Sequence, residues 1–296
     1  MARKLLNPIF VEATTLPDAW FQAVYQCIHH GRDFIIDRGS YAGDKRLEFD
    51  YFTAHIAQPW VGSEENINRL LPQLSEACSI PNPVEDGYLD NYAPIYLMSG
   101  DLKFEESYTY GQRMTKYKIP EEWVVMRHFA GNKATKEKPW KEILIQEDEF
   151  WKDEKIVFKE DGYYYLNQIE LLKKTYVSKG WRNNQMVLQI AHPSDMLLQD
   201  PPCLRLIDTR IQEEYDGKTY LHFFPEFRSW DLWGGFPANL GGIELMKQII
   251  AAEMGVENGS MIVRSKGLHL YKFVWELAEA ISNKSIEDAR ECILQP

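Results

Sequence analysis

Residues 219–263 read TYLHFFPEFRSWDLWGGFPANLGGIELMKQIIAAEMGVENGSMIV. The first part, residues 219–224, is rich in aromatic residues and predicts a buried strand. Residues 240–254 carry apolar side chains at helical spacing, which predicts a long helix that ends at Gly255. Residues 260–263 predict a further strand. The apolar positions of the predicted helix are Ile243, Met246, Ile249 and Ile250.

The same alternation of strands and helices continues on the N-terminal side of this stretch. Apolar runs at residues 186–190 and 204–207 predict two more strands, and a turn at residues 215–218 predicts a hairpin into the strand at 219–224. Helical spacing predicts helices over residues 16–30 and 166–177. We therefore expect an α+β fold with a mixed or antiparallel sheet backed by helices.

Bulk composition narrows the class of protein. The chain has 296 residues, of which 45% are hydrophobic and 26% charged, and its net charge is −11. Because an acidic surface repels phosphate backbones, we do not expect a general nucleic-acid-binding surface. No apolar stretch approaches 18 residues and the N-terminus has no long apolar run, so we expect neither a membrane span nor a secretory signal.

The four cysteines are widely spaced and form no CxxC pair, so we expect reduced thiols in the cytoplasm and no metal site. Repeats and low-complexity linkers are absent from the sequence. We expect one domain over residues 1–296, with a partly inserted region at about residues 60–165. Within that region, residues 132–155 are dense in Lys, Glu and Trp and are expected to be solvated.

Cys203 is the candidate nucleophile. The two prolines before it, Pro201 and Pro202, fix φ and lack amide donors, so they hold the thiol on a restrained backbone. Arg228 and Ser229 follow the predicted strand at residues 219–224 and suit an anionic oxygen such as a phosphate. A cation beside a thiol lowers its pKa towards neutrality, and the thiolate is the reactive form.

Four further polar side chains follow. Asp231 and Asn239 flank a glycine-rich bend, where each could instead cap a turn or a helix. The carboxamide of Asn239 has one acceptor and two donors, which match the O4 and N3–H edge of uracil; a flipped amide would match cytosine. His269 and Tyr271 are two residues apart, so on a strand they share one face and suit a sugar hydroxyl.

Several short strings in this order resemble the thymidylate synthase and pyrimidine nucleotide hydroxymethylase family, most closely its archaeal-type thymidylate synthases. The resemblance is dense over residues 180–280. The strings are Asp-Pro-Pro-Cys203, Phe-Arg228-Ser229-Trp-Asp231, Gly-Phe-Pro-Ala-Asn239, Leu-His269-Leu-Tyr271 and, upstream, Asp37-Arg38 and Tyr108-Thr109-Tyr110-Gly111-Gln112-Arg113.

The resemblance implies a reaction in which Cys203 adds to C6 of a pyrimidine nucleotide and C5 receives a one-carbon unit from methylenetetrahydrofolate or a related pterin. It also implies a homodimer whose sheets pack back to back. The other implied roles are Arg38, Arg228 and Ser229 for the 5′-phosphate, Asn239 for the base, His269 and Tyr271 for the sugar, Asp231 for the pterin, and Tyr110 for proton movement at C5.

Two departures from the family pattern concern charged side chains. Where the family has two adjacent arginines that reach the phosphate across the dimer interface, the sequence reads Asn183-Asn184, with Arg182 beside them. The segment that should carry the family's catalytic glutamate, residues 91–97, contains no acidic residue. The nearest acidic residues are Asp90, Glu105 and Glu106.

Three functions therefore stay open at the level of sequence. The leading one is methylation of dUMP to dTMP. The second is hydroxymethylation of CMP, dCMP or dUMP, which would use the same residues. The third is a catalytically weak relative that only binds a nucleotide.

Overall fold

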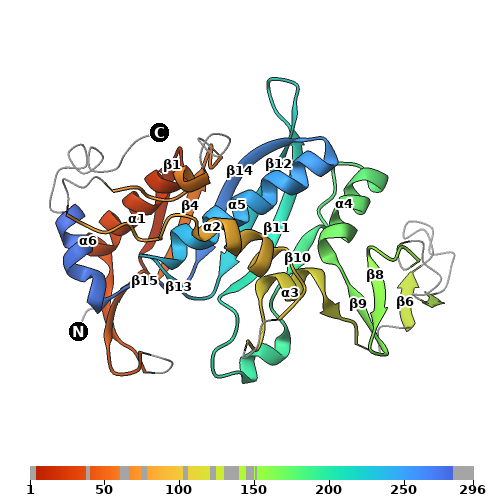
Figure 1. Ribbon diagram of the computed structural model, residues 1–296, viewed down its shortest axis with the longest axis horizontal. Coiled ribbons are helices and arrows are strands. Elements are labelled where there is room, and N and C mark those ends of the chain that lie inside the picture. The colour runs from red at the N-terminus through yellow and green to blue at the C-terminus, as the bar shows by residue number, and fades with distance from the viewer. Residues whose placement is uncertain are drawn as a thin grey trace.

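A computed structural model of the chain describes residues 5–37, 41–60, 67–74, 79–102, 106–120, 125–129, 140–144, 150 and 152–282. Figure 1 shows a twisted sheet with helices packed along it and a small β-rich lobe at one end. Within the described residues, no helix is long and apolar enough to cross a membrane.

The main sheet has six strands and mixed pairing, which confirms the predicted α+β class. Its outer β1–β4 pair and its central β14–β12 pair are parallel, and the other neighbours are antiparallel. In spatial order the strands are β1 (Pro8–Ala13), β4 (Tyr51–Ile56), β14 (Glu257–Ser265), β12 (Thr219–Phe227), β11 (Leu204–Glu213) and β10 (Val187–Gln189).

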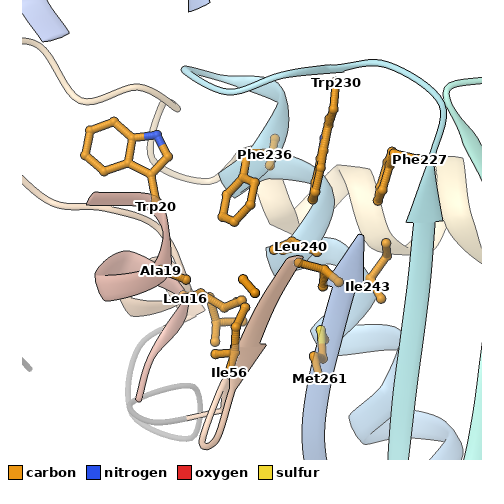
Figure 2. Packing of buried hydrophobic residues seen from close by; sticks show 14 of the residues in the cluster. Leu16, Ala19, Trp20, Ile56, Phe227, Trp230, Phe236, Leu240, Ile243 and Met261 are labelled. Carbon is orange, nitrogen blue, oxygen red and sulfur yellow. The ribbon is translucent and has the colours of Figure 1, made fainter. Parts of the chain in front are cut away.

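The helix α5 (Gly235–Met254) lies along this sheet and builds the core with it (Figures 1 and 2). Alternate residues of β12 are buried, as a half-covered strand requires. Figure 2 shows Phe227 of β12 and Met261 of β14 beside Leu240 and Ile243 of α5, all essentially buried. Each such side chain contributes about 1.5–3 kcal/mol through burial.

The start of α5 differs from the prediction. The helix begins at Gly235, five residues before Leu240, because Asp231 caps the preceding turn and leaves the glycines and Pro237 free to enter the first turn. The predicted buried face was also partly wrong. Ile249 is 42% exposed, whereas Lys247 is fully buried through its ion pair with Glu244 at 3.0 Å.

The helix α1 (Leu16–His30) agrees with the sequence prediction at both ends. The Thr15 side chain caps its first turn, and the chain leaves the helix at Gly31. Trp20 on its buried face donates its indole N–H to the carbonyl groups of Leu232 and Trp233, each at 3.0 Å. This contact ties α1 to the turn that leads into α5.

A second sheet of four strands lies against one end of α1, in the order β13 (Trp230–Asp231), β15 (Leu268–Tyr271), β3 (Lys45–Glu48) and β2 (Arg32–Ile35). Its β13–β15 pair is parallel and sets Asp231 opposite His269. Residues that are 38 positions apart in sequence are thereby brought side by side.

The remaining described elements lie around these two sheets (Figure 1). Much of the predicted solvated insertion at residues 132–155 falls outside the described residues. The helices and strands are α2 (Tyr88–Asn91), a π-helical segment (Tyr92–Leu97), α3 (Tyr110–Thr115), β5 (Tyr117–Lys118), β6 (Val125–Phe129), β7 (Trp140–Leu144), β8 (Val157–Glu160), β9 (Tyr163–Leu166), α4 (Gln168–Lys179) and α6 (Trp275–Ser282). Short 3₁₀ helices cover Ile67–Leu70, Pro193–Leu197 and Lys272–Val274.

Candidate active site

Cys203 lies immediately before β11, where that strand pairs with the end of β12. Leu204 is opposite Phe227 in the register, and the backbone N–H of Arg228 donates to the Cys203 carbonyl oxygen at 2.9 Å. The sheet itself therefore places Arg228 next to the thiol, as the sequence predicted.

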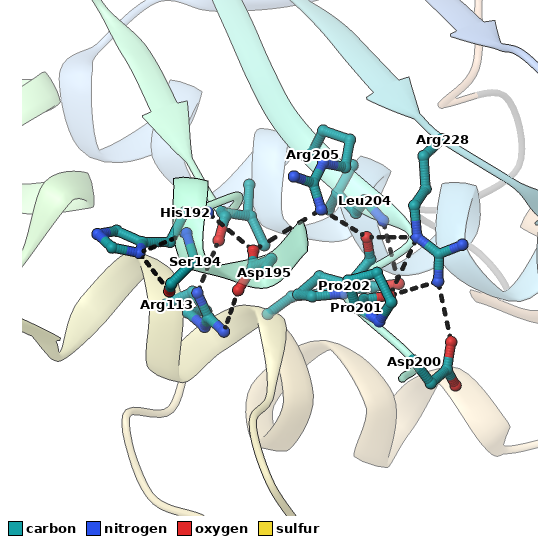
Figure 3. Close-up of polar contacts among 12 residues, drawn as sticks. Arg113, His192, Ser194, Asp195, Asp200, Pro201, Pro202, Leu204, Arg205 and Arg228 are labelled. Atoms are coloured by element: carbon teal, nitrogen blue, oxygen red, sulfur yellow. Dashed lines mark hydrogen bonds and ion pairs between the residues drawn. The ribbon is translucent and has the colours of Figure 1, made fainter. Parts of the chain in front are cut away.

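The Arg228 guanidinium binds the backbone of the residues just before Cys203, and these contacts form a clamp at the start of β11 (Figure 3). Its Nε donates to the carbonyl oxygens of Pro201 at 3.1 Å and Pro202 at 3.3 Å, and its Nη2 contacts the Asp200 carboxylate at 2.9 Å. Asp200 is 81% exposed, so this ion pair is screened and weak. An incoming phosphate could replace that carboxylate.

Two more arginines, Arg205 and Arg113, extend this network of polar contacts (Figure 3). Arg205 donates to the Pro202 carbonyl oxygen at 3.2 Å and lies 3.7 Å from the Asp195 carboxylate, which Arg113 contacts at 2.9 Å. Burial opposes ionisation of Asp195, but hydrogen bonds from the His192 backbone and Arg113 outweigh it and lower its pKa. Asp195 is therefore a fixed anion that anchors the loop before Cys203.

The electrostatics of the thiol differ from the prediction. Burial raises the pKa of Cys203 above its ordinary value, and the opposing charges of Arg228 and Arg205 do not overcome it, while Asp200 raises it further. The cost of moving a thiolate out of water exceeds the benefit from two partly exposed cations. Cys203 is a protonated thiol at neutral pH in this structure.

Two tyrosines, Tyr108 just before α3 and Tyr110 at its start, lie near the thiol of Cys203. The Tyr110 hydroxyl oxygen accepts the Leu204 backbone N–H at 3.3 Å, which places it beside Cys203. Burial and the nearby Cys203 raise the pKa of Tyr110, and the same causes raise the pKa of Tyr108 to about 12. Both side chains are therefore neutral phenols that can donate or relay a proton.

Asp231 caps the turn into α5. Its carboxylate accepts three backbone N–H groups: Trp233 at 3.2 Å, Gly234 at 3.0 Å and Gly235 at 2.8 Å. The capping role considered from the sequence is therefore present. The side chain is still half-exposed, and Oδ1 accepts only one of the three bonds, so it can accept another donor from a ligand.

Asn239 lies in the second turn of α5, so it is not the N-cap residue that the sequence allowed. Its Oδ1 accepts the Trp230 indole N–H at 2.9 Å, and its Nδ2 donates to the Tyr92 hydroxyl at 2.6 Å. Trp230 and Tyr92 were not proposed from the sequence. Trp230 lies between Ser229 and Asp231 in the sequence, and this position beside two predicted site residues could have identified it.

His269 and Tyr271 lie on one face of β15, as predicted, with ring centroids 4.6 Å apart. His269 is 2% exposed, and burial lowers its pKa to about 4, so it is neutral. Its Nδ1 is 2.8 Å from the Gly267 carbonyl oxygen, which requires the proton on Nδ1. Nε2 is then a buried acceptor with no partner among the described residues, suited to a hydroxyl donor.

The structure says less about two of the residues predicted to bind the phosphate, Ser229 and Arg38. Ser229 is half-buried beside Arg228 and makes no side-chain hydrogen bond among the described residues. Arg38 lies outside the described residues. Arg182 does not join Cys203 in the same chain. It lines a cavity of about 640 Å³ with Arg210, which is roughly 23 Å along β11 from Cys203.

The three acidic candidates for a catalytic carboxylate differ in their surroundings. Asp90 is exposed on α2, Glu106 is half-buried, and Glu105 lies outside the described residues. Instead, the residue that projects from that region towards Asn239 is Tyr92. Among the described residues, no group of three His, Cys, Asp or Glu side chains could hold a metal ion.

The sequence model of the family described as "Thymidylate synthase" matches residues 113–293, which is more than half of the chain. The chain belongs to the thymidylate synthase family. Members of the thymidylate synthase family generally use methylenetetrahydrofolate and act on a pyrimidine nucleotide.

Similar proteins come from archaea. A "Putative thymidylate synthase" of Methanosarcina acetivorans is 25% identical over 92% of this chain and 93% of its own length. One of Methanosarcina barkeri is 24% identical over the same shares. A third, from Methanothermobacter thermautotrophicus, is 30% identical over 30% of this chain and 38% of its own length. Similarity to the two Methanosarcina proteins therefore extends along nearly the whole chain, at a low level of sequence identity.

Proposed function

We propose that the protein methylates dUMP at C5 through a covalent bond between Cys203 and C6. The observation that carries this proposal is the clamp at the start of β11, where Arg228 grips the proline carbonyls and Tyr110 contacts the next amide. The clamp holds a lone thiol beside a cation and two phenols, in a family that acts on pyrimidine nucleotides.

The first step adds Cys203 to the ring. A water molecule takes the thiol proton, the sulfur forms a bond to C6, and the C5–C6 π electrons move to C5 and O4 as an enolate. C5 of a free pyrimidine is a poor nucleophile, and this addition makes it electron-rich. Because burial holds the proton on the thiol and the anionic phosphate would not favour a free thiolate, we expect the sulfur–carbon bond to form as the proton leaves.

The second stage concerns C5 and the proton that it must lose. When bound, methylenetetrahydrofolate supplies the one-carbon unit and, for methylation, the hydride. Tyr110 stands beside Cys203 as a neutral phenol, so it can orient a water that takes the C5 proton. Elimination of the sulfur from C6 then restores the ring and the free cysteine.

The binding roles follow the positions of the side chains. We propose that Arg228, Ser229 and Arg38 hold the 5′-phosphate, that Asn239 reads the base, and that His269 and Tyr271 hold the sugar. The unpaired buried Nε2 of His269 supports the sugar role. The available lone pairs of the half-exposed Asp231 carboxylate fit the N–H groups of a pterin.

We also propose a homodimer with the six-stranded sheets packed back to back, each chain forming one domain. The face of β12 opposite α5 carries Tyr220 and Phe224, and its neighbour β14 carries Ile262 there, all half-buried. The same face also carries polar side chains, among them His222, Glu226 and Arg264, so the proposed interface combines apolar and polar contacts. Arg182 lines the cavity beside Arg210, and we propose that in the dimer it takes the place of the two adjacent arginines of the family pattern.

Mass spectrometry of the products tests the proposed reaction. The purified protein is incubated with methylenetetrahydrofolate and dUMP, dCMP or CMP in turn. The expected product is dTMP from dUMP. A hydroxymethyl product would show that the protein is a hydroxymethylase and not a methylase. Tight nucleotide binding without any product would show that the protein is not a catalyst of either reaction.

A further inference from the structure

We infer that Trp230 and Tyr92 lock the Asn239 carboxamide in one orientation, so that the site selects uracil and rejects cytosine. The inference rests on the proposed function, because it presumes that Asn239 faces the base. It adds two residues, neither of which the family resemblance assigned, and it decides which of the two amide orientations the site uses.

Trp230 fixes the oxygen end of the amide. An indole N–H can only donate, so the Asn239 atom at 2.9 Å from it must be the carbonyl oxygen. The indole cannot turn away, since Trp230 is 2% exposed and stacks on Phe227 with ring centroids 3.8 Å apart and planes at 4°. Phe236 covers it as well, with centroids 4.6 Å apart.

Tyr92 fixes the nitrogen end. Asn239 Nδ2 donates to the Tyr92 hydroxyl oxygen at 2.6 Å, and the phenol is held between the rings of Tyr88 and Tyr96 at centroid distances of 5.4 and 5.9 Å. Burial raises the pKa of Tyr92 well above its ordinary value, so it keeps its proton. Among the described residues, that proton has no acceptor.

The hydrogen-bonding groups of Asn239 and Tyr92 that have no partner in the part of the chain that the structure describes are the ones that a base would contact. Asn239 keeps one N–H and one lone pair on Oδ1, and Tyr92 keeps one O–H donor. Uracil offers O4 as an acceptor for the donors and N3–H as a donor for Oδ1. Cytosine offers an amine and a bare N3, so both contacts would be mismatched. A flip of the amide would set Nδ2 against the Trp230 N–H.

The test measures the affinities of dUMP and dCMP by calorimetry on the full chain, without folate. The wild-type protein should bind dUMP at least about 10-fold more tightly than dCMP, because unpaired buried polar groups are costly. Trp230→Phe frees the amide and should reduce this ratio to within about 3-fold. Tyr92→Phe should weaken dUMP binding about 5-fold or more and leave dCMP binding nearly unchanged.

The matched controls make the same chemical changes at neighbouring rings that do not touch Asn239. Trp233→Phe and Tyr88→Phe should keep the wild-type ratio. If Trp230→Phe does not fold, Tyr92→Phe and the wild-type ratio still decide. Unchanged selectivity in a folded Trp230→Phe variant, or a wild-type preference for dCMP, would overturn the inference. Failure of the wild-type protein to bind either nucleotide would instead overturn the proposed function.

Discussion

At the scale of single residues, the groups around Cys203 act on its thiol in opposite directions. Burial and the Asp200 carboxylate favour the neutral thiol, while Arg228 and Arg205 favour the thiolate. Arg228 also holds the loop in place through the carbonyl groups of Pro201 and Pro202. The arginine therefore has a positioning role in the free protein in addition to its proposed phosphate contact.

The alkylation rate of Cys203 should report this balance. Without ligand, the rate with iodoacetamide should still be rising at pH 9, because the pKa of the thiol lies above its ordinary value. Arg228→Gln should move the rate profile to higher pH, and Asp200→Asn should move it to lower pH. Arg32→Gln, on the distant strand β2, should leave it unchanged. A plateau below pH 8 would contradict this account.

At the scale of elements, the turn between β13 and α5 joins structure and site. Asp231 accepts three backbone N–H groups there, and Trp20 of α1 donates to two carbonyl groups of the same turn. Asn239 and Trp230 depend on this turn for their positions. A loss of the cap should therefore affect both folding and the site.

Asp231→Ala should lower the free energy of unfolding by about 1–2 kcal/mol, since three amide donors lose their acceptor. Urea denaturation measures this directly. Asp216→Ala, which removes a carboxylate from the exposed hairpin turn before β12, should change it by much less. Equal effects of the two substitutions would show that the cap is not the stabilising feature.

Local patterns in the sequence predicted α1, α4 and the strands β11, β12 and β14, because an element that buries one face has apolar residues at regular intervals along the chain. The start of α5 was predicted too late, since glycine and proline usually mark turns and the Asp231 cap is a tertiary feature. The pairing of β4 with β1 and β14 joins distant segments, and no local period encodes such a partner.

The candidate site was predicted in outline. The strings around Cys203, Arg228 and His269 stand in the sequence, and the structure brings these residues to adjoining strand ends. The contact of Tyr92 with Asn239 spans 147 positions, so it required the fold. The thiol pKa was predicted in the wrong direction, because the extent of burial cannot be read from neighbouring residues.

At the scale of the whole molecule, two histidines, the half-buried His222 and the buried His269, make folding sensitive to acid. Burial lowers the pKa of His222 and of His269 to about 4. Between pH 6.5 and 4 the unfolded chain binds protons that the folded chain does not, so the stability falls as the pH is lowered. Each histidine should contribute on the order of 1–3 kcal/mol over this range.

Urea unfolding at pH 6.5, 5.5 and 4.5 should show this loss of stability. His222→Gln combined with His269→Gln should flatten the dependence, whereas His30→Gln, at an exposed position at the end of α1, should not. A double variant with the wild-type slope would contradict the assignment.

The open sheet face predicts the oligomeric state. Light scattering should give a mass twice the 34.6 kDa of one chain. Ile262→Asp, on the face opposite α5, should shift the protein towards the monomer, while Ile249→Asp, on the exposed side of α5, should not. A wild-type monomer at micromolar concentration would contradict the proposed packing.

The most direct test of the central claim is the release of tritium from dUMP labelled at C5, in the presence of methylenetetrahydrofolate. The wild-type protein and Cys27→Ala, which changes the buried thiol of α1, should both release tritium into water. Cys203→Ser should release none while it binds dUMP with nearly the wild-type affinity. Release by Cys203→Ser at the wild-type rate would show that the bond between this sulfur and C6 is not part of the reaction.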